Sequence, residues 1–257
     1  MVAMTMNGAR SETRYFYVWM AAICALMAFG GFAGTYWLQV PAGTFVGEPI
    51  IHLHAALFSG WTLLFLSQTW QAAAGRMEHH RAWGVVGAAL VGAMVIVGFA
   101  AALNSLRNGI AGGYGDAARD FMIIPVTAIL LFAGLFTAAL VNVSRPDWHK
   151  RIMLVATVSI LQAAMARVFL LAINGGGPGV RPGLGPPPPV QITIGPAIVA
   201  NLLILAGIVY DWRTRGRPHP AYLWAGGVVL AVQIIRIPLS TSPAWRAVAS
   251  LLESFLA

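Results

Sequence analysis

Seven mostly apolar runs of about 20 residues follow one another along the chain, and they constrain its fold more than any other feature. A bilayer offers the backbone no hydrogen-bond partners, so a crossing segment must form a helix of about 20 residues. Charged residues make up only 9% of the chain, too few to cover a soluble protein of this length. We predict an all-α polytopic membrane protein with seven transmembrane helices. The predicted spans are 15–38, 50–73, 82–103, 121–143, 152–173, 192–210 and 221–239.

The remaining segments divide the chain around a seven-helix transmembrane domain at 15–239. Residues 1–14 are predicted to form an N-terminal tail. The Gly/Pro-rich stretch 174–191 is predicted to form a mobile external loop, because glycine is too free and proline lacks a donor for regular structure. Residues 243–257 are predicted to form a short amphipathic helix that lies in the membrane interface. Its apolar side would carry Trp245, Val248, Leu251, Leu252 and Phe255.

The basic residues predict the orientation. With the N-terminus in the cytoplasm, ten basic residues fall in cytoplasmic segments and four on the opposite side, which is the positive-inside pattern. The four are Arg107, Arg119, Arg181 and Arg246. The net charge of +8 does not indicate a nucleic-acid partner, because the basic residues form short clusters between apolar runs rather than one stripe. The lipid bilayer is the predicted partner, and the single cysteine, Cys24, excludes an intrachain disulfide framework.

Four of the six histidines fall on the predicted cytoplasmic side, so that face is the first candidate site. Imidazole ligates zinc, iron and copper, and a carboxylate often orients the far ring nitrogen. His80 and His149 are the candidate axial ligands of a haem b, or ligands of a transition metal. His79, His219 and Asp211 are candidates to complete a metal site. The alternative is that these histidines lie at headgroup level, where they bind lipid phosphate or cap helix ends.

A second candidate site lies in the outer half of the predicted bundle. Arg167 and Arg236 fall within spans, where an arginine costs roughly 2.5 kcal/mol or more unless it is paired or hydrated. With His54, they are candidate ligand-binding residues of an outward polar pocket for an anionic group such as a carboxylate. The alternative is that both arginines extend to the outer interface. His54 also recurs with Trp61 and Gln68 at intervals of seven, a pattern that favours a helix-packing seam.

Several short motifs together resemble a family of small bacterial multi-pass inner-membrane proteins of unknown function. The resemblance covers roughly residues 50–240. Its motifs are His52-Leu53-His54, His80-Arg81, Trp148-His149-Lys150-Arg151 and Gly216-Arg217 with His219-Pro220-Ala221. It implies a multi-pass protein of the bacterial inner (plasma) membrane, and it brings no activity or cofactor.

Three functions are compatible with these patterns. The first is electron transfer or redox chemistry with a redox partner, at a cytoplasmic-face haem b or metal site. The second is a cofactor-free transporter or small-molecule binder that uses the pocket around Arg167, and the third is a structural or assembly subunit. A retinal protein is excluded, because it needs a lysine in its last span and the only lysine is Lys150.

Overall fold

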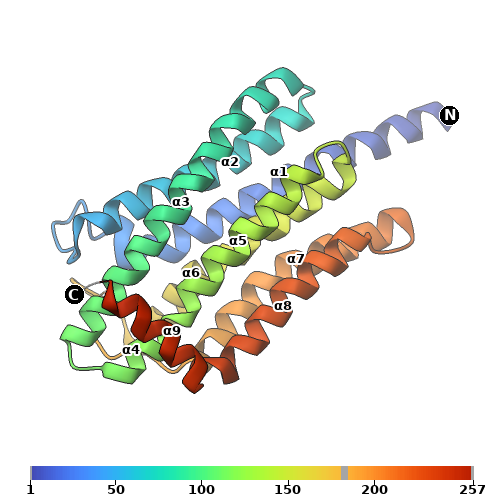
Figure 1. Cartoon of the computed structure of the whole chain (residues 1–257). Coiled ribbons are helices and arrows are strands. Elements are labelled where there is room, and N and C mark those ends of the chain that lie inside the picture. The colour runs from blue at the N-terminus through green and yellow to red at the C-terminus, as the bar shows by residue number, and fades with distance from the viewer. Residues whose placement is uncertain (1, 181–184, 256–257) are drawn as a thin grey trace.

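The computed structural model describes residues 2–180 and 185–255, with side chains described from residue 15 onward. All of the regular elements in these ranges are helices (Figure 1). They are α1 (Val2–Phe32), α2 (Pro49–Ala73), α3 (Met77–Ala111), α4 (Gly115–Phe121), α5 (Ile123–Val141), α6 (Pro146–Asn174), α7 (Ile194–Arg215), α8 (Pro220–Ser240) and α9 (Pro243–Ser254). A π-helical turn (Ala33–Trp37) follows α1, and a 3-10 turn (Val190–Thr193) precedes α7.

Seven helical segments in the described ranges are long and apolar enough to cross a membrane, which confirms the all-helical, seven-span prediction. Several helix boundaries in the structure differ from the predicted ones. Residues 2–14 are helical and continuous with α1, ahead of the span that begins at Tyr15, and α3 runs over Met77–Ala111, beyond the predicted 82–103. The fourth span, Gly115–Val141, includes both α4 and α5. Apolar runs mark the thickness of the bilayer, whereas a helix continues into polar sequence until a stop signal ends it.

Proline and glycine set many of the helix ends. Proline occupies the first turn of α2, α6, α8 and α9, where its missing N–H costs no hydrogen bond. Gly216 ends α7 in the left-handed conformation, with φ of 74°. These signals produce short turns between α2 and α3, between α5 and α6, and between α7 and α8.

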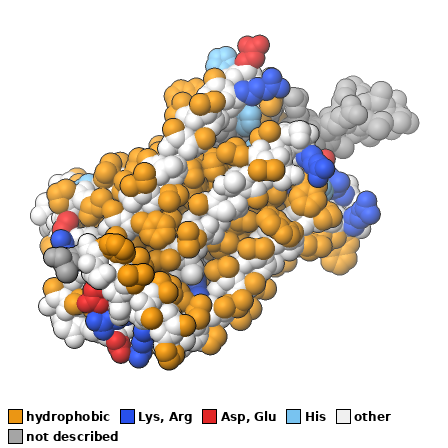
Figure 2. Space-filling view, in the orientation of Figure 1, with side chains coloured by type: hydrophobic (Ala, Val, Ile, Leu, Met, Phe, Trp, Pro, Cys, Tyr) orange, Lys and Arg blue, Asp and Glu red, His pale blue; other side chains and the backbone are white. Residues whose placement is uncertain are grey.

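These three turns lie at one end of the bundle, and α4 and α9 lie at the other (Figure 1). We call the first the histidine end, because it carries His79, His80, His149 and His219, and the second the α9 end. Apolar side chains cover the middle of the visible face, and charged side chains gather towards its ends (Figure 2). This distribution is the one that a lipid environment requires.

Helix α6 is the centre of the bundle and contacts α1, α5, α7 and α8. One turn in its first half is completely enclosed: Leu154, Val155 and Ala156 have no exposed surface. The pair α2–α3 lies on one side of this centre and the pair α7–α8 on the other (Figure 1). A side chain on α6 can therefore face either side of the bundle, which decides how the candidate sites are assembled.

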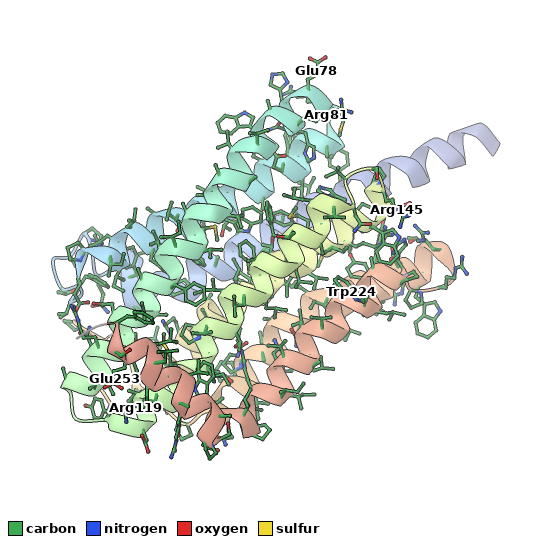
Figure 3. The ribbon with its side chains drawn as sticks, in the orientation of Figure 1. Glu78, Arg81, Arg119, Arg145, Trp224 and Glu253 are labelled. Atoms are coloured by element: carbon green, nitrogen blue, oxygen red, sulfur yellow. The ribbon has the colours of Figure 1, made fainter. Side chains whose placement is uncertain are left out.

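Helix α9 is docked on α4 by polar contacts. Trp245 donates from Nε1 to the Arg119 carbonyl (2.9 Å), Arg246 pairs with Asp120 (2.7 Å), and Glu253 pairs with Arg119 (2.8 Å; Figure 3). Trp245 and Leu252 pack inward, whereas Val248, Leu251 and Phe255 are exposed. At about 100° per residue, the five apolar residues lie within one third of the helix circumference and so share one side: two of them pack on the bundle and three are exposed. Residues 256–257 of this predicted helix lie outside the described residues.

The described part of the Gly/Pro-rich loop is connected to the rest of the bundle by hydrogen bonds. The Gln39 side chain donates to the carbonyls of Gly177 and Val180 and accepts from the backbone N–H of Gly179. Val190, which the prediction placed in the loop, is buried at the start of the 3-10 turn. Arg181, one of the four basic residues expected on the side opposite the cytoplasm, lies outside the described residues.

Candidate functional site

The structure brings together the two histidines predicted to act as a pair. His80 is in the first turns of α3 and His149 in the first turn of α6, and both side chains are half-buried. Their ring centroids are 6.4 Å apart and their ring planes are perpendicular, at 88°. They come from two hairpins, α2–α3 and α5–α6, so this contact connects segments almost 70 residues apart in the sequence.

Each ring is held by the preceding helix of its own hairpin. His80 Nδ1 lies 3.2 Å from the Gln68 carbonyl oxygen on α2, and His149 Nδ1 lies 2.8 Å from the Ala139 carbonyl oxygen on α5. A carbonyl oxygen only accepts, so each Nδ1 carries a hydrogen. In the neutral ring, each Nε2 then has its lone pair available. A metal-ligating histidine needs this tautomer, with a carbonyl that fixes the far nitrogen.

The ring separation is that of an edge-to-face ring contact, and it is also compatible with two imidazoles that bind one metal. A metal–nitrogen bond is about 2 Å, and the centroid of an imidazole lies about 1 Å beyond the bonded nitrogen. Two rings on opposite sides of one metal would therefore have centroids about 6 Å apart, close to the observed 6.4 Å. The pair can also accept hydrogen bonds through the two Nε2 atoms.

The other residues predicted for this site have different contacts. His79 is exposed beside His80. His219 is buried at the start of α8 and its ring packs edge-on against Trp148, with centroids 5.5 Å apart. Asp211 forms an ion pair with Arg151, in which Arg151 Nε lies 2.7 Å from Asp211 Oδ2. The described residues contain no group of three or more histidine, cysteine, aspartate or glutamate side chains that could hold a metal ion.

The pair of Arg151 and Asp211 was not predicted from the sequence. The Arg151 side chain is 3% exposed and that of Asp211 is 1% exposed, and two hydrogen bonds connect the guanidinium with the carboxylate. Asp211 Oδ2 also accepts the His219 backbone N–H (3.3 Å), so the pair joins α6, α7 and the start of α8. A sequence signal was available, since Arg151 directly precedes the predicted span 152–173 and Asp211 directly follows the predicted span 192–210. Only the rotation of the two helices decides that the residues meet.

His219 caps α8, which makes the stability of this end dependent on pH. Its Nδ1 accepts the backbone N–H of Ala221 (3.1 Å), and only an unprotonated Nδ1 can do so. Burial, with the positive charges of Arg151 and Arg215, lowers the pKa of His219 below its ordinary value, against the smaller opposing effect of Asp211 and Asp147. The fold therefore favours the neutral ring. Its contribution to stability is complete above about pH 6.5 and is lost as the pH falls towards the lower folded-state pKa.

We expect the His219→Asn variant to lose less stability than the wild type between about pH 7 and about pH 5. Asparagine also caps helices but does not titrate in this range. Thermal unfolding of both proteins in detergent, at several pH values, measures the difference. The other histidines are present in both proteins, so parallel pH profiles would contradict this role for His219.

At the α9 end, the structure separates the residues of the predicted outer pocket. Arg167 lies with its Cζ 5.5 Å from the Phe32 ring of α1 and interacts electrostatically with His54 of α2. Arg236 lies on the other side of α6, where its Nη2 donates to Gln162 Oε1 (2.7 Å) and to Thr193 Oγ1 (3.4 Å). The two arginines therefore lie on different sides of α6 and do not line one pocket. Arg236 is 4% exposed, so it does not extend to the interface.

His54, Trp61 and Gln68 form part of the packing of α2. Trp61 is buried, and its ring meets Phe132 and Phe136 of α5 edge-on, at 5.2 and 5.5 Å. This contact is the one that a packing seam requires. His54 Nδ1, Trp61 Nε1 and Gln68 Nε2 are all buried without a hydrogen-bond partner among the described residues.

Comparisons with known proteins add no further constraint: no protein-family model, curated protein or solved structure matches this chain.

Proposed function

We propose that the protein binds one haem b between His80 and His149 and carries single electrons in the membrane. The observation that carries the proposal is the geometry of this pair: two perpendicular rings 6.4 Å apart, each with Nδ1 held by a backbone carbonyl. In this tautomer, the Nε2 atoms of His80 and His149 are the ones that would hold the iron of a haem. Carbonyl contacts to the far nitrogen increase the basicity of such ligands.

Haem suits this pair better than a bare metal ion does. A structural zinc site needs four protein ligands and a catalytic one needs three. A haem would bring most of its iron's ligands with it, so two histidines would suffice to hold it. Arg81 and Arg145 lie at the same end of the bundle, where their positive charge would favour the anionic propionates of a haem (Figure 3).

Electron transfer is the chemistry that suits this ligation. A haem held by His80 and His149 would supply one-electron redox chemistry, through which single electrons would pass from a reduced partner to an oxidised one. Axial ligands and their hydrogen bonds set the potential of such a haem.

We further propose that the histidine end faces the cytoplasm of a bacterial inner membrane. The excess of basic residues in the segments at this end supports this orientation. The motif resemblance to bacterial inner-membrane proteins supports the compartment. Alkaline phosphatase fused to the C-terminus tests the orientation. An active fusion would place the C-terminus outside the cytoplasm, as this orientation requires.

The absorption spectrum of the purified protein tests the haem. We expect a Soret band, the spectrum of a reduced haem b after dithionite, and one iron per chain. His80→Ala and His149→Ala should each remove a ligand, and we expect at least a tenfold loss of bound haem, the size typical of lost metal-site contacts. His79→Ala is the matched control, because His79 is adjacent to His80 but exposed, and it should keep the wild-type spectrum.

Two results would overturn the proposal. One is a wild-type protein, produced with ample haem precursor, that has neither a Soret band nor stoichiometric iron. The other is a His80→Ala or His149→Ala variant that keeps the wild-type spectrum and haem content.

A further inference from the structure

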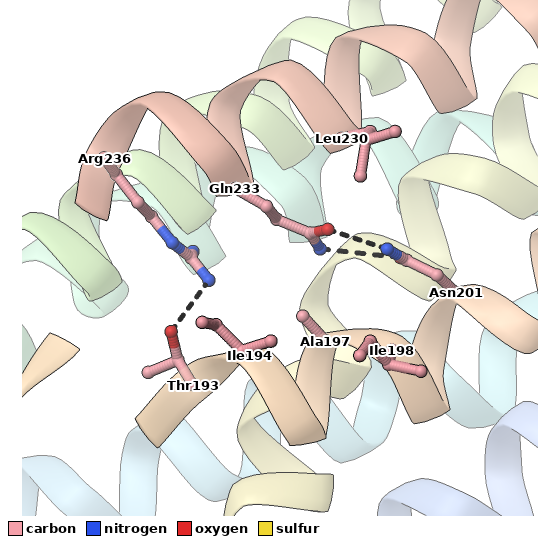
Figure 4. Close-up of a pocket in the computed structure, with 8 residues that line it drawn as sticks. All are labelled: Thr193, Ile194, Ala197, Ile198, Asn201, Leu230, Gln233 and Arg236. Atoms are coloured by element: carbon pink, nitrogen blue, oxygen red, sulfur yellow. Dashed lines mark hydrogen bonds between the residues drawn. The ribbon is translucent and has the colours of Figure 1, made fainter. Parts of the chain in front are cut away.

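We infer that the α9 end of the bundle contains a binding site for a small monovalent anion, of halide or carboxylate size, at Arg236. The site is distinct from the histidine pair, because it lies between α7 and α8 near their ends at the opposite end of the bundle (Figure 4). The inference rests on a buried charge, its neutral partners and an adjoining pocket.

Arg236 keeps its positive charge inside the bundle. Arginine is not deprotonated in proteins, and the residue is 4% exposed. Its recorded acceptors, Gln162 Oε1 and Thr193 Oγ1, are both neutral, and both bond to Nη2. The Nε atom is buried and donates to no acceptor among the described residues. The guanidinium therefore has donor capacity that the described residues do not use.

No described carboxylate neutralises this charge. The chain has only eight acidic residues, and the side chain of one, Glu12, is not described. Six others accept bonds from residues other than Arg236. The remaining one, Glu78, is exposed at the start of α3, at the histidine end (Figure 3). Because buried charges in proteins are paired or bind ions, a counter-ion from outside the chain would complete this site.

The guanidinium borders a pocket of about 90 Å³ between α7 and α8 (Figure 4). Thr193, Asn201, Gln233 and Arg236 form its polar lining, and Ile198 and Leu230 belong to its apolar lining. A single water needs about 10–15 Å³ of such space, so the pocket has room for a small anion with some of its water. A polyhydroxylated anion such as gluconate does not suit the pocket, because its hydroxyl groups would lie against the apolar lining.

The amide pair in the pocket adds donors. Asn201 Nδ2 donates to Gln233 Oε1 (2.7 Å), and Gln233 Nε2 donates back to Asn201 Oδ1 (3.4 Å). Each amide nitrogen has two hydrogens and uses one in this pair. A second hydrogen on each nitrogen is therefore available to a ligand. One full positive charge and surplus N–H donors select an anion over a cation or a neutral solute.

Thermal unfolding in nanodiscs of pure phosphatidylcholine tests the site. The wild type is compared in sodium chloride, sodium formate and sodium gluconate at equal ionic strength, and with sodium oleate added to the gluconate sample. A ligand at ten times its Kd should raise the Tm by about 3–5 °C for a protein of this size. We expect chloride and formate to raise the Tm saturably above its value in gluconate. A rise with oleate alone also supports the carboxylate site and identifies the membrane as the source.

Three variants assign the effect to the site. Arg236→Gln removes the charge and should abolish the rise, whereas Arg107→Gln, an exposed arginine of the same end, should keep it. Leu230→Trp fills the pocket without changing a polar group and should also abolish the rise, which keeps the test valid if Arg236→Gln does not fold. An unchanged wild-type Tm in all salts overturns the inference. A full rise in folded Arg236→Gln, or in Leu230→Trp, overturns it as well.

Discussion

Replacement of Asp211 by alanine is expected to lower the free energy of unfolding by about 3–5 kcal/mol. The variant would remove the buried carboxylate that pairs with the Arg151 guanidinium, which is 3% exposed, and leave only the half-exposed Asp147 in contact with it. A charge that remains buried without a partner costs far more than the intact pair contributes. Denaturation with sodium dodecyl sulfate in mixed micelles, followed by far-UV circular dichroism or tryptophan fluorescence, measures the loss.

Two further variants separate the buried charge from the general effect of a substitution. Asp147→Ala removes the other carboxylate that contacts Arg151, but its side chain is 54% exposed, so we expect a loss of less than about 1 kcal/mol. The double variant Arg151→Met with Asp211→Leu removes both charges and should recover most of the stability lost by Asp211→Ala. If Asp211→Ala costs no more than Asp147→Ala, the pair does not have the role assigned to it.

The second large effect is expected at Gly31, where α1 meets α6. A Cβ added at Gly31 would lie 2.6 Å from the carbonyl oxygen and 2.8 Å from the Cβ of Ala164. These atoms belong to the backbone and first side-chain carbon of α6, so no flexible side chain can move away. Gly31→Ala should therefore cost about 1–3 kcal/mol, and Gly31→Leu more, by forcing the two helices apart.

The adjacent glycine is the matched control for this prediction. A Cβ at Gly30 would meet nothing within 4 Å, so Gly30→Ala should leave the stability unchanged or raise it by up to about 1 kcal/mol through better helix propensity. Detergent denaturation of both variants gives the comparison. Equal free energies of unfolding for Gly30→Ala and Gly31→Ala would contradict the close approach of α1 and α6.

Helix α6 connects these predictions with the two proposed sites. It carries His149 and Arg151 at the histidine end and Gln162 and Arg167 towards the α9 end. Residues 154–159, in its first half, are all buried against neighbouring helices, so its rotation fixes the direction of all four side chains. A substitution that displaces α6, such as Gly31→Leu, should therefore also reduce haem binding at His149, although it lies far along the helix from that residue.

Much of the architecture follows from the sequence alone. Apolar length determines the number of spans, because the bilayer has a fixed thickness and each span must satisfy its own backbone. The alternation of spans then places His80, His149, His219 and Asp211 at one end of the bundle. The pairing of His80 with His149 was also expected, because short hairpins hold both histidines at the same depth.

Only the tertiary structure decided which side chains meet at each depth. The hydropathy of a lipid-exposed helix does not depend on its rotation or on the order of its neighbours. Hydropathy therefore could not show that Asp211 pairs with Arg151. Nor could it show that Arg167 and Arg236 lie on different sides of α6. Close packing settles both, because small residues such as Gly31 and Ala164 fix how α1 and α6 approach, and a packed helix has one rotation.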